Sequence, residues 1–314
     1  MKKTKVGIVG AGLVGATAGY SLAMMGTCSE IVLYDINSDI AQGKAIDIGQ
    51  ATTYSPKSTI VTGATDASDL SDCDIVVITA GVPRKSDMTR ADLLLINAKI
   101  IKDVTSNIMK YSPNAVIICV SNPLDIMTYV VQKLTKINRN KVIGMAGALD
   151  GARMAYQINQ TLGFGSGQVK PMLIGDHGQN MIPMPNISTV GGIPLNALIS
   201  KEEMNNIINR TKDGGAQIVK HLGTSAYYAP ARAIAVMVEA ILHDSKLVMP
   251  SSVVLDGEYG YSDVAVGVPV VLGINGIEKI IELNLDDDTK EKFKISVDSI
   301  KEGIKILEEN NFFN

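Results

Sequence analysis

The first half of the chain alternates short apolar runs with segments of helical periodicity. The runs are rich in Val and Ile, lack polar residues at alternate positions, and cover residues 5–10, 30–35, 74–81, 115–123 and 142–147. Strands of this kind are buried on both faces, as in a parallel sheet covered by helices. The pattern therefore predicts a doubly wound α/β domain, in which ligands bind beyond the carboxyl ends of the strands.

The second half has a different pattern. Glycine pairs at Gly191–Gly192 and Gly214–Gly215 indicate breaks between elements, and residues 224–242 are typical of a long, mostly buried helix. Between Ser252 and Leu272, β-rich runs flank the turn-forming residues 256–260, which predicts a hairpin. We expect these elements to pack tightly against the first half.

An amphipathic helix is predicted to close the chain. Asp288 and Glu291 have a spacing similar to that of a capping box. Apolar residues then recur at helical intervals and are expected to be structural: Phe293, Val297, Ile300, Ile304 and Leu307.

Composition narrows the class of protein. The 314 residues are 46% apolar and 19% charged, as in a globular rather than a disordered protein. Because the net charge is −3, no nucleic-acid or anionic-membrane surface is expected. The apolar stretches end well before the ~18 residues of a membrane span, and the run after the first three residues is too short for a signal peptide.

The three cysteines, Cys28, Cys73 and Cys119, are far apart and set in apolar sequence. Such cysteines indicate buried free thiols in a reducing compartment, so we expect a cytoplasmic protein. No pair has the spacing of metal ligands and the chain has only three histidines, so no metal site is expected.

A glycine-rich turn joins the first strand to the first helix. It consists of Gly10, Ala11, Gly12, Leu13, Val14 and Gly15, and Asp35 ends the second strand 20 residues further on. This combination is typical of dinucleotide binding, because the glycines permit a tight turn, approach of a pyrophosphate and close helix packing. Asp35 would accept hydrogen bonds from a ribose and repel a 2′-phosphate, which favours NAD over NADP. The alternative is an ordinary strand-to-helix turn.

Charged and polar residues follow the next strands. Arg84, Lys85 and Arg90 lie in the segment 81–90, either as ordinary surface charge or as cations over a bound cofactor. Asn122 follows the strand that ends at residue 120 and precedes a proline. It is either a turn former or an amide that orients a nicotinamide or a substrate oxygen.

Two later segments carry candidate chemistry. If a helix starts near Asp150, then Asp150 and Arg153 share a face. Asp150 could accept a hydrogen bond from a histidine, and the forked guanidinium of Arg153 could bind a carboxylate. Alternatively, the two residues form a surface ion pair. His177 lies in a glycine-flanked loop after an apolar run, which favours a catalytic histidine over a structural one.

Together these motifs resemble the lactate/malate dehydrogenase family over nearly the whole chain, from the glycine turn through GVPRKSDMTR, SNP, LDGAR and GDHG to SAYYAPA. The resemblance implies that His177 is the proton donor and acceptor and that Asp150 hydrogen-bonds it. It also implies that Arg153 and Arg84 bind the two carboxylates of a substrate and that Arg90 polarises its carbonyl. Arginine at position 84 is the malate-type residue, where lactate-specific members usually carry glutamine.

The same resemblance implies cofactor contacts beyond the glycine turn from Asn97, Val120, Ser121 and Asn122, and substrate contact from Asn122. Two residues depart from the family pattern. Gln179 stands where an acidic residue usually follows His-Gly, and Gly151 stands where a serine usually follows Leu-Asp. Both lie beside implied catalytic residues.

The implied fold is a Rossmann doubly wound parallel sheet over residues 1–147, followed by an α+β substrate/catalytic domain over residues 148–314. The implied reaction is reversible hydride transfer between (S)-malate and NAD to give oxaloacetate and NADH, as in the tricarboxylic acid cycle. A homo-dimer or homo-tetramer with a dicarboxylate substrate is implied, without a nucleic-acid or membrane partner. A lactate or other 2-hydroxy-acid dehydrogenase and a non-catalytic NAD-binding sensor are the alternatives.

Overall fold

The computed structural model describes residues 3–55, 57–83, 88–165 and 167–313. In these ranges, nine strands form one sheet in the order β14-β13-β12-β6-β5-β4-β1-β2-β3. Six of them are parallel: β1 (Lys5–Val9), β2 (Glu30–Tyr34), β3 (Ile60–Gly63), β4 (Ile75–Ile78), β5 (Val116–Cys119) and β6 (Val142–Gly144). Every residue of β4, β5 and β6 is buried, which confirms the prediction of strands covered on both faces.

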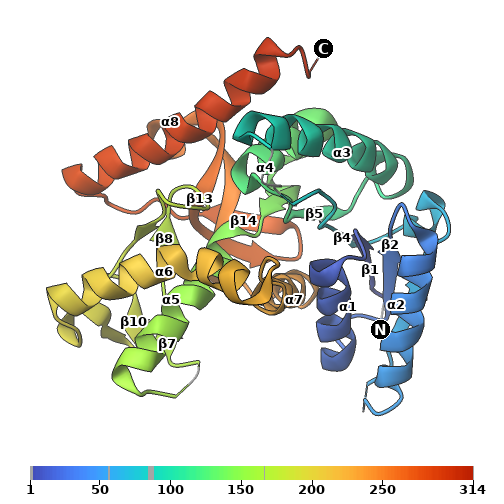
Figure 1. Cartoon of the computed structure of the whole chain (residues 1–314), viewed down its shortest axis with the longest axis horizontal. Helices are drawn as coiled ribbons and strands as arrows, with labels where there is room; N and C mark the ends of the chain where they lie inside the picture. Colours follow the sequence, from blue (N-terminus) through green and yellow to red (C-terminus); the bar gives the residue numbers. More distant parts are fainter. Residues whose placement is uncertain (1–2, 56, 84–87, 166, 314) are drawn as a thin grey trace.

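Helices cover both faces of the parallel strands (Figure 1). On one face lie α1 (Leu13–Met25), α2 (Ser38–Thr52) and α7 (Tyr228–Leu242). On the other lie α3 (Arg90–Tyr111) and α4 (Leu124–Thr135), with the end of α8 (Asp287–Glu309) against them. The doubly wound α/β architecture predicted from the sequence is therefore present. Gly26, whose φ is 59°, is the C-cap of α1.

Strand β3 was not among the predicted strands. It is an edge strand that pairs only with β2, and its side chains are alternately exposed and half-buried. Ile60, for example, is 65% exposed. A short edge strand does not produce the continuous apolar run of a central parallel strand, so the sequence pattern did not reveal it.

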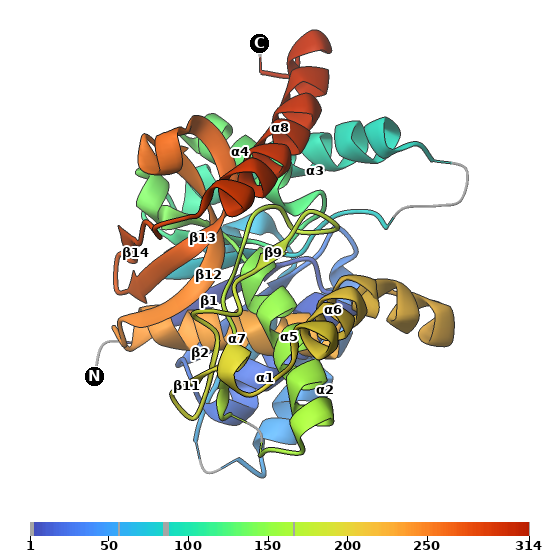
Figure 2. The same cartoon turned by 90° about the vertical axis from the view of Figure 1, so that its left-hand side faces the viewer.

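The second half extends the same sheet. The predicted hairpin is formed by β12 (Leu247–Asp256) and β13 (Ser262–Gly273), and β14 (Gly276–Ile280) lies beyond it at the edge. β12 runs antiparallel to β6, with Ser252 opposite Gly144. Consequently one continuous sheet joins the two halves, as Figure 2 shows from the side.

Two long helices and two small sheets complete the second half. The helices are α5 (Ala146–Leu162) and α6 (Lys201–Leu222). The small strands are β7 (Val169–Lys170), β8 (Leu173–Ile174), β9 (Ile182–Pro183), β10 (Thr189–Val190) and β11 (Ile193–Pro194). Short 3₁₀ turns are η1 (Ala67–Leu70), η2 (Arg139–Lys141), η3 (Leu195–Ala197) and η4 (Glu258–Gly260).

Four predicted helix features were wrong in detail. Gly214–Gly215 is not a break, because both glycines lie inside α6, which Ser200 and Glu203 cap. The helix predicted over 224–242 starts at Tyr228, and α5 starts at Ala146 rather than near Asp150. The N-cap of α8 is Asp286 rather than Asp288, because Asp286 Oδ1 accepts the Thr289 N–H at 2.8 Å.

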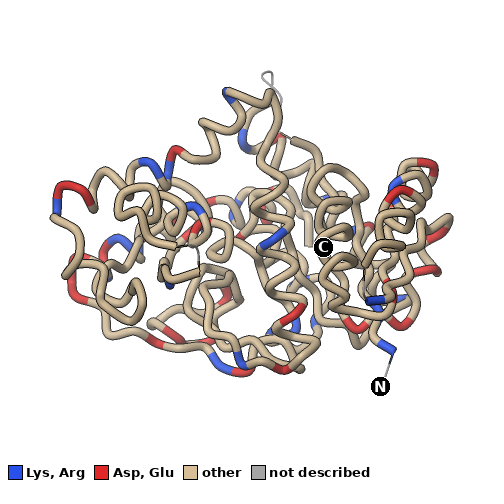
Figure 3. Tube along the Cα trace, turned by 90° about the horizontal axis from the view of Figure 1, so that it is seen from below, with Lys and Arg blue, Asp and Glu red and all other residues tan. Residues whose placement is uncertain are grey.

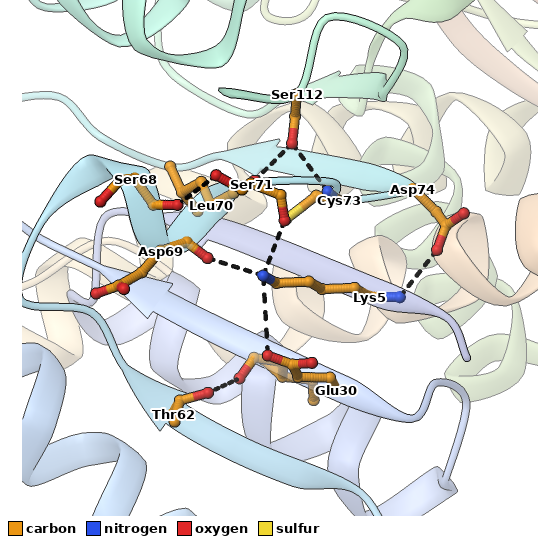
Figure 4. Close-up of polar contacts among 11 residues, drawn as sticks. Lys5, Glu30, Thr62, Ser68, Asp69, Leu70, Ser71, Cys73, Asp74 and Ser112 are labelled. Carbon is orange, nitrogen blue, oxygen red and sulfur yellow. Dashed lines mark hydrogen bonds and ion pairs between the residues drawn. The ribbon is translucent and has the colours of Figure 1, made fainter. Parts of the chain in front are cut away.

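Lys5 ties several elements together at the amino edge of the sheet (Figure 4). Its Nζ donates to the carbonyl oxygens of Asp69 and Ser71 at 2.9 Å each, and lies 3.9 Å from Glu30 Oε1. Its main-chain N–H donates to Asp74 Oδ2 at 2.9 Å. These contacts fix the amino ends of β1, β2 and β4, opposite the edge where ligands are expected.

Charges of both signs are interspersed along the chain (Figure 3). No helix within the described residues is long and apolar enough to cross a membrane. All three cysteines are buried and free, as predicted. Burial raises the pKa of Cys28 and Cys119 to about 12 and that of Cys73 to about 11, so these thiols stay protonated.

Candidate active site

His177 and Asp150 lie in direct contact beyond the carboxyl ends of the strands. His177 follows β8 in a loop where Gly175 and Gly178 have φ values of 92° and 154°, which favour glycine. Its Nδ1 lies 2.8 Å from Oδ2 of Asp150, whose side chain is 3% exposed. A carboxylate at this distance favours the proton on Nδ1, and Nε2 is then the nitrogen left for a reacting group.

The same contact sets the charge of the imidazole. Burial alone would lower the pKa of His177. The negative charge of Asp150 and its hydrogen bond outweigh burial, so the pKa is raised above the ordinary value of 6.5. His177 can therefore be protonated near neutral pH and still lose its proton in a reaction.

Arg153 lies one helical turn after Asp150 on α5. Its Nη1 is 3.3 Å from Asp150 Oδ1, so the two oxygens of one carboxylate contact the arginine and the histidine. The Arg153 side chain is 18% exposed, and its Nε has no hydrogen-bond partner among the described residues. Free donors on a partly open guanidinium suit a substrate carboxylate. Because Asp150 is buried in the second turn of α5, the alternative of a surface ion pair is wrong.

Asp125 is a site residue that sequence reasoning did not single out. It lies in the first turn of α4, is 4% exposed, and accepts the main-chain N–H of His177 through Oδ2 at 2.7 Å. Burial raises its pKa to about 6. The available signal was an acidic residue at the start of the otherwise apolar segment 124–131.

Arg90 shares a cleft of about 270 Å³ with His177. It is the first residue of α3, which Thr89 caps, so it lies on a helix rather than in a loop. The cleft is lined by residues of α3, α4, α8 and the loop after β8, among them Arg90, Asp125, Asp176, His177, Ser299 and Glu302. Arg84 and Lys85 lie outside the described residues.

The glycine turn has the geometry expected of a dinucleotide site. Gly10 has a φ of 102°, and a Cβ on Gly15 would overlap the carbonyl oxygen of Gly10. A Cβ on Gly12 would meet nothing within 4 Å, so open space lies beside this residue. Gly12 is the N-cap of α1 and has no side chain that could accept an N–H of the first turn. An anion could therefore approach the helix N-terminus, and the turn fits a pyrophosphate.

Asp35 is held against this turn. Its Oδ2 accepts the N–H of Ala11 at 2.8 Å and its Oδ1 accepts the N–H of Asn37 at 3.0 Å. The carboxylate thus lies beside the glycine turn, as required of a ribose-binding acidic residue.

Asn97 connects two loops of the site. Its Oδ1 accepts the N–H of Val82 at 2.9 Å, and its Nδ2 donates to the Asn122 carbonyl at 2.7 Å. With 1% of its surface exposed, Asn97 positions these loops, and its direct contact with NAD stays a prediction. Asn122 itself is exposed, so its side-chain amide is accessible to a ligand.

Val120 and Ser121 are anchored to the end of β4. The Val120 N–H donates to the Ile78 carbonyl at 2.9 Å, and the Ser121 hydroxyl donates to the Ala80 carbonyl at 2.5 Å. Both residues follow β5 at the carboxyl edge, where a cofactor is expected. In the part of the chain that the structure describes, no cluster of three or more His, Cys, Asp or Glu could hold a metal ion.

Comparison with known families accounts for this arrangement. Residues 4–144 match the model of the lactate/malate dehydrogenase NAD binding domain, and residues 147–311 match that of the lactate/malate dehydrogenase alpha/beta C-terminal domain. The chain belongs to the lactate/malate dehydrogenase family. This finding confirms the family resemblance that the motifs indicated. It also confirms the predicted NAD-binding Rossmann fold.

Similar members of the family span the whole chain. The malate dehydrogenase of Sulfurimonas denitrificans is 55% identical over 311 residues, which cover 99% of this chain and 98% of the relative. The crystal structure of Cryptosporidium parvum malate dehydrogenase has a TM-score of 0.93 at 41% identity, covering 98% of this chain and 99% of the other. The lactate dehydrogenase of that organism, complexed with lactic acid and NAD, has a TM-score of 0.93 at 35% identity and the same coverage.

Proposed function

We propose that this member of the family catalyses the reversible, NAD-dependent oxidation of (S)-malate to oxaloacetate. The observation that carries the proposal is the Asp150 carboxylate, which holds His177 at 2.8 Å and Arg153 at 3.3 Å. The Asp150 carboxylate thereby positions both a proton-transfer group, His177, and a carboxylate-binding group, Arg153. The relatives named malate dehydrogenase, at up to 55% identity over nearly the whole chain, support the choice of substrate.

His177 acts as the proton donor and acceptor. In the reducing direction, protonated His177 gives its proton to the substrate oxygen, and in the oxidising direction neutral His177 removes it. Asp150 stabilises the cation and keeps the proton on Nδ1 when the imidazole is neutral. Asp125 fixes the His177 main chain by accepting its N–H.

Three arginines bind the substrate in this proposal. Arg153 pairs with one carboxylate, Arg90 with the reacting oxygen, and Arg84 with the second carboxylate. All three roles come from the family resemblance. Arg90 lines the same cleft as His177, and Arg153 contacts the same Asp150 carboxylate as His177, while Arg84 lies outside the described residues. Arg90 would stabilise the negative charge that grows on the reacting oxygen.

The glycine turn, Asp35 and the exposed amide of Asn122 would hold NAD, with Val120 and Ser121 at the strand ends beside it. When bound, the nicotinamide supplies or accepts the hydride. The residues of the chain bind and orient the substrate, exclude water and hold the proton at His177 Nε2.

The test is a comparison of initial rates of NADH and NADPH oxidation with oxaloacetate and with pyruvate. We expect rapid turnover only with oxaloacetate and NADH. Faster turnover of pyruvate would indicate a lactate dehydrogenase. Binding of NADH without turnover of any 2-keto acid would indicate a non-catalytic sensor.

Three further predictions stay proposals. We place the boundary between a NAD-binding domain and a substrate domain at residues 147 and 148, where β6 has ended and α5 has begun. A homo-dimer or homo-tetramer is proposed on the family resemblance alone, and sedimentation velocity would decide between them. A cytoplasmic location rests only on the three free cysteines.

A further inference from the structure

Two adjacent glycines lie well inside α6, a helix of 22 residues. Neither Gly214 nor Gly215 has a positive φ, so the backbone does not require glycine at either position. A glycine in a helix interior destabilises the helix relative to alanine, because it loses more backbone conformational entropy on folding. The reason for a glycine here must therefore lie in what packs against the helix.

The neighbour of this glycine pair is Arg153. Helices α5 and α6 lie side by side in both views (Figures 1 and 2). A Cβ on Gly215 would lie 3.3 Å from Arg153 Nη2 and 3.7 Å from both Cζ and Nη1. A Cβ on Gly214 would lie 3.6 Å from Cδ and 3.9 Å from Cγ, which are ordinary van der Waals distances. Only a side chain at position 215 would come closer than 3.4 Å to the guanidinium group.

Little else holds that guanidinium. Within the described residues, Nη1 donates to Asp150 Oδ1 at 3.3 Å, and Nε is buried without a hydrogen-bond partner. Bidentate binding of a carboxylate requires the planar fork to be correctly placed to a fraction of an ångström. The bare backbone at Gly215 is therefore part of what sets the position of the fork.

We propose that Gly215 is a positioning residue for substrate: it leaves the space in which the Arg153 guanidinium lies and so sets affinity for the substrate carboxylate. The proposal rests on the proposed function. It concerns Gly215, because a Cβ on Gly214 would lie nearest Cδ and Cγ of the arginine and 4.0 Å from Nε, all at ordinary contact distances.

The test compares Gly215→Ala with Gly214→Ala in the full-length protein. Both variants should be at least as thermally stable as the wild type, because alanine favours the helix. Both should bind NADH with unchanged Kd. Gly215→Ala should raise KM for oxaloacetate about tenfold with a smaller change in kcat, whereas Gly214→Ala should stay within about twofold of the wild type.

A second measurement separates a local from a general effect. In an Arg153→Lys background, which lacks the guanidinium group, adding Gly215→Ala should change KM less than twofold. Equal KM values for Gly215→Ala and Gly214→Ala would overturn the proposal, as would an undiminished effect in the Arg153→Lys background. If the wild type does not turn over oxaloacetate, the proposed function itself fails, which is a different result.

Discussion

Asp150 and His177 are 27 residues apart in sequence, yet Asp150 Oδ2 lies 2.8 Å from His177 Nδ1. Both side chains are largely buried, at 3% and 15% exposure. At this distance and burial, the carboxylate is the main reason that the pKa of His177 is raised rather than lowered.

Replacing Asp150 by asparagine should remove the charge that stabilises protonated His177. At neutral pH we expect kcat/KM for oxaloacetate reduction to fall by about 10²–10⁴. In the wild type, reduction slows as pH rises through the pKa of His177, above 6.5. In Asp150→Asn this decline should begin at lower pH, because the pKa is no longer raised. Unchanged NADH affinity is the control, and an unshifted pH profile would contradict the role of Asp150.

Replacing Arg153 by lysine keeps the positive charge but removes the planar fork. We expect KM for oxaloacetate to rise roughly 10–100-fold, because a charged hydrogen bond of about 1.5–3 kcal/mol is lost. Arg139→Lys is a matched control, since Arg139 makes a forked contact with Glu258 at 3.0 and 2.6 Å instead. It should lower thermal stability without changing KM. Equal KM values in the two variants would show that Arg153 does not bind substrate.

Asp125 should make stability depend on pH. Because its pKa in the folded protein is raised from 3.8 to about 6, the neutral carboxyl is favoured by folding. Its contribution is fully present below pH 3.8 and is lost as pH rises through about 6. Roughly 3 kcal/mol of unfolding free energy is involved.

The variant Asp125→Asn keeps an oxygen that can accept the His177 N–H but cannot ionise. Denaturant unfolding between pH 4 and pH 7 should therefore show a steeper decline in the wild type than in the variant, which keeps only the contributions of other groups with raised pKa values, such as Asp176. Parallel stability curves for the two proteins would mean that Asp125 titrates normally in the folded state.

Arg84→Gln should shift the substrate preference toward pyruvate. In the role that the family resemblance gives Arg84, pyruvate would leave this cation without a carboxylate partner in the substrate site, at a cost of roughly 3–5 kcal/mol. That corresponds to discrimination by a factor of about 10²–10³ or more, which the variant should largely lose. The ratio of kcat/KM for oxaloacetate to that for pyruvate measures the effect. A ratio that stays at the wild-type value would assign selectivity to another residue.

The individual pieces of the site are local in sequence and could be predicted. The glycine turn with Asp35 lies on one strand–turn–helix–strand unit, and Asp150 and Arg153 lie one helical turn apart. Spacing rules do not predict contacts between distant segments, and the contact of Asp150 with His177 was expected only from the family resemblance. Asp125 meets the His177 main chain across 52 residues, and no spacing rule connects them.

The glycines of α6 illustrate the same limit. Gly214–Gly215 has the local signature of a break, yet the pair is helical because the helix is capped at Ser200 and packs against α5. Propensity is a weak signal that tertiary contacts override. Gly215 leaves space for the Arg153 guanidinium, and this relationship exists only once α5 and α6 are packed together.

The amino-acid sequence alone determined the parallel strand–helix alternation, the dinucleotide turn and the family, since these depend on short-range periodicity and fixed spacings. Tertiary structure decided that the hairpin β12–β13 joins the same sheet, that Asp125 accepts the main-chain N–H of His177, and that Gly215 lies beside Arg153. Such contacts form between segments that the chain brings together only when its apolar faces are buried, so their geometry is a property of the packed core.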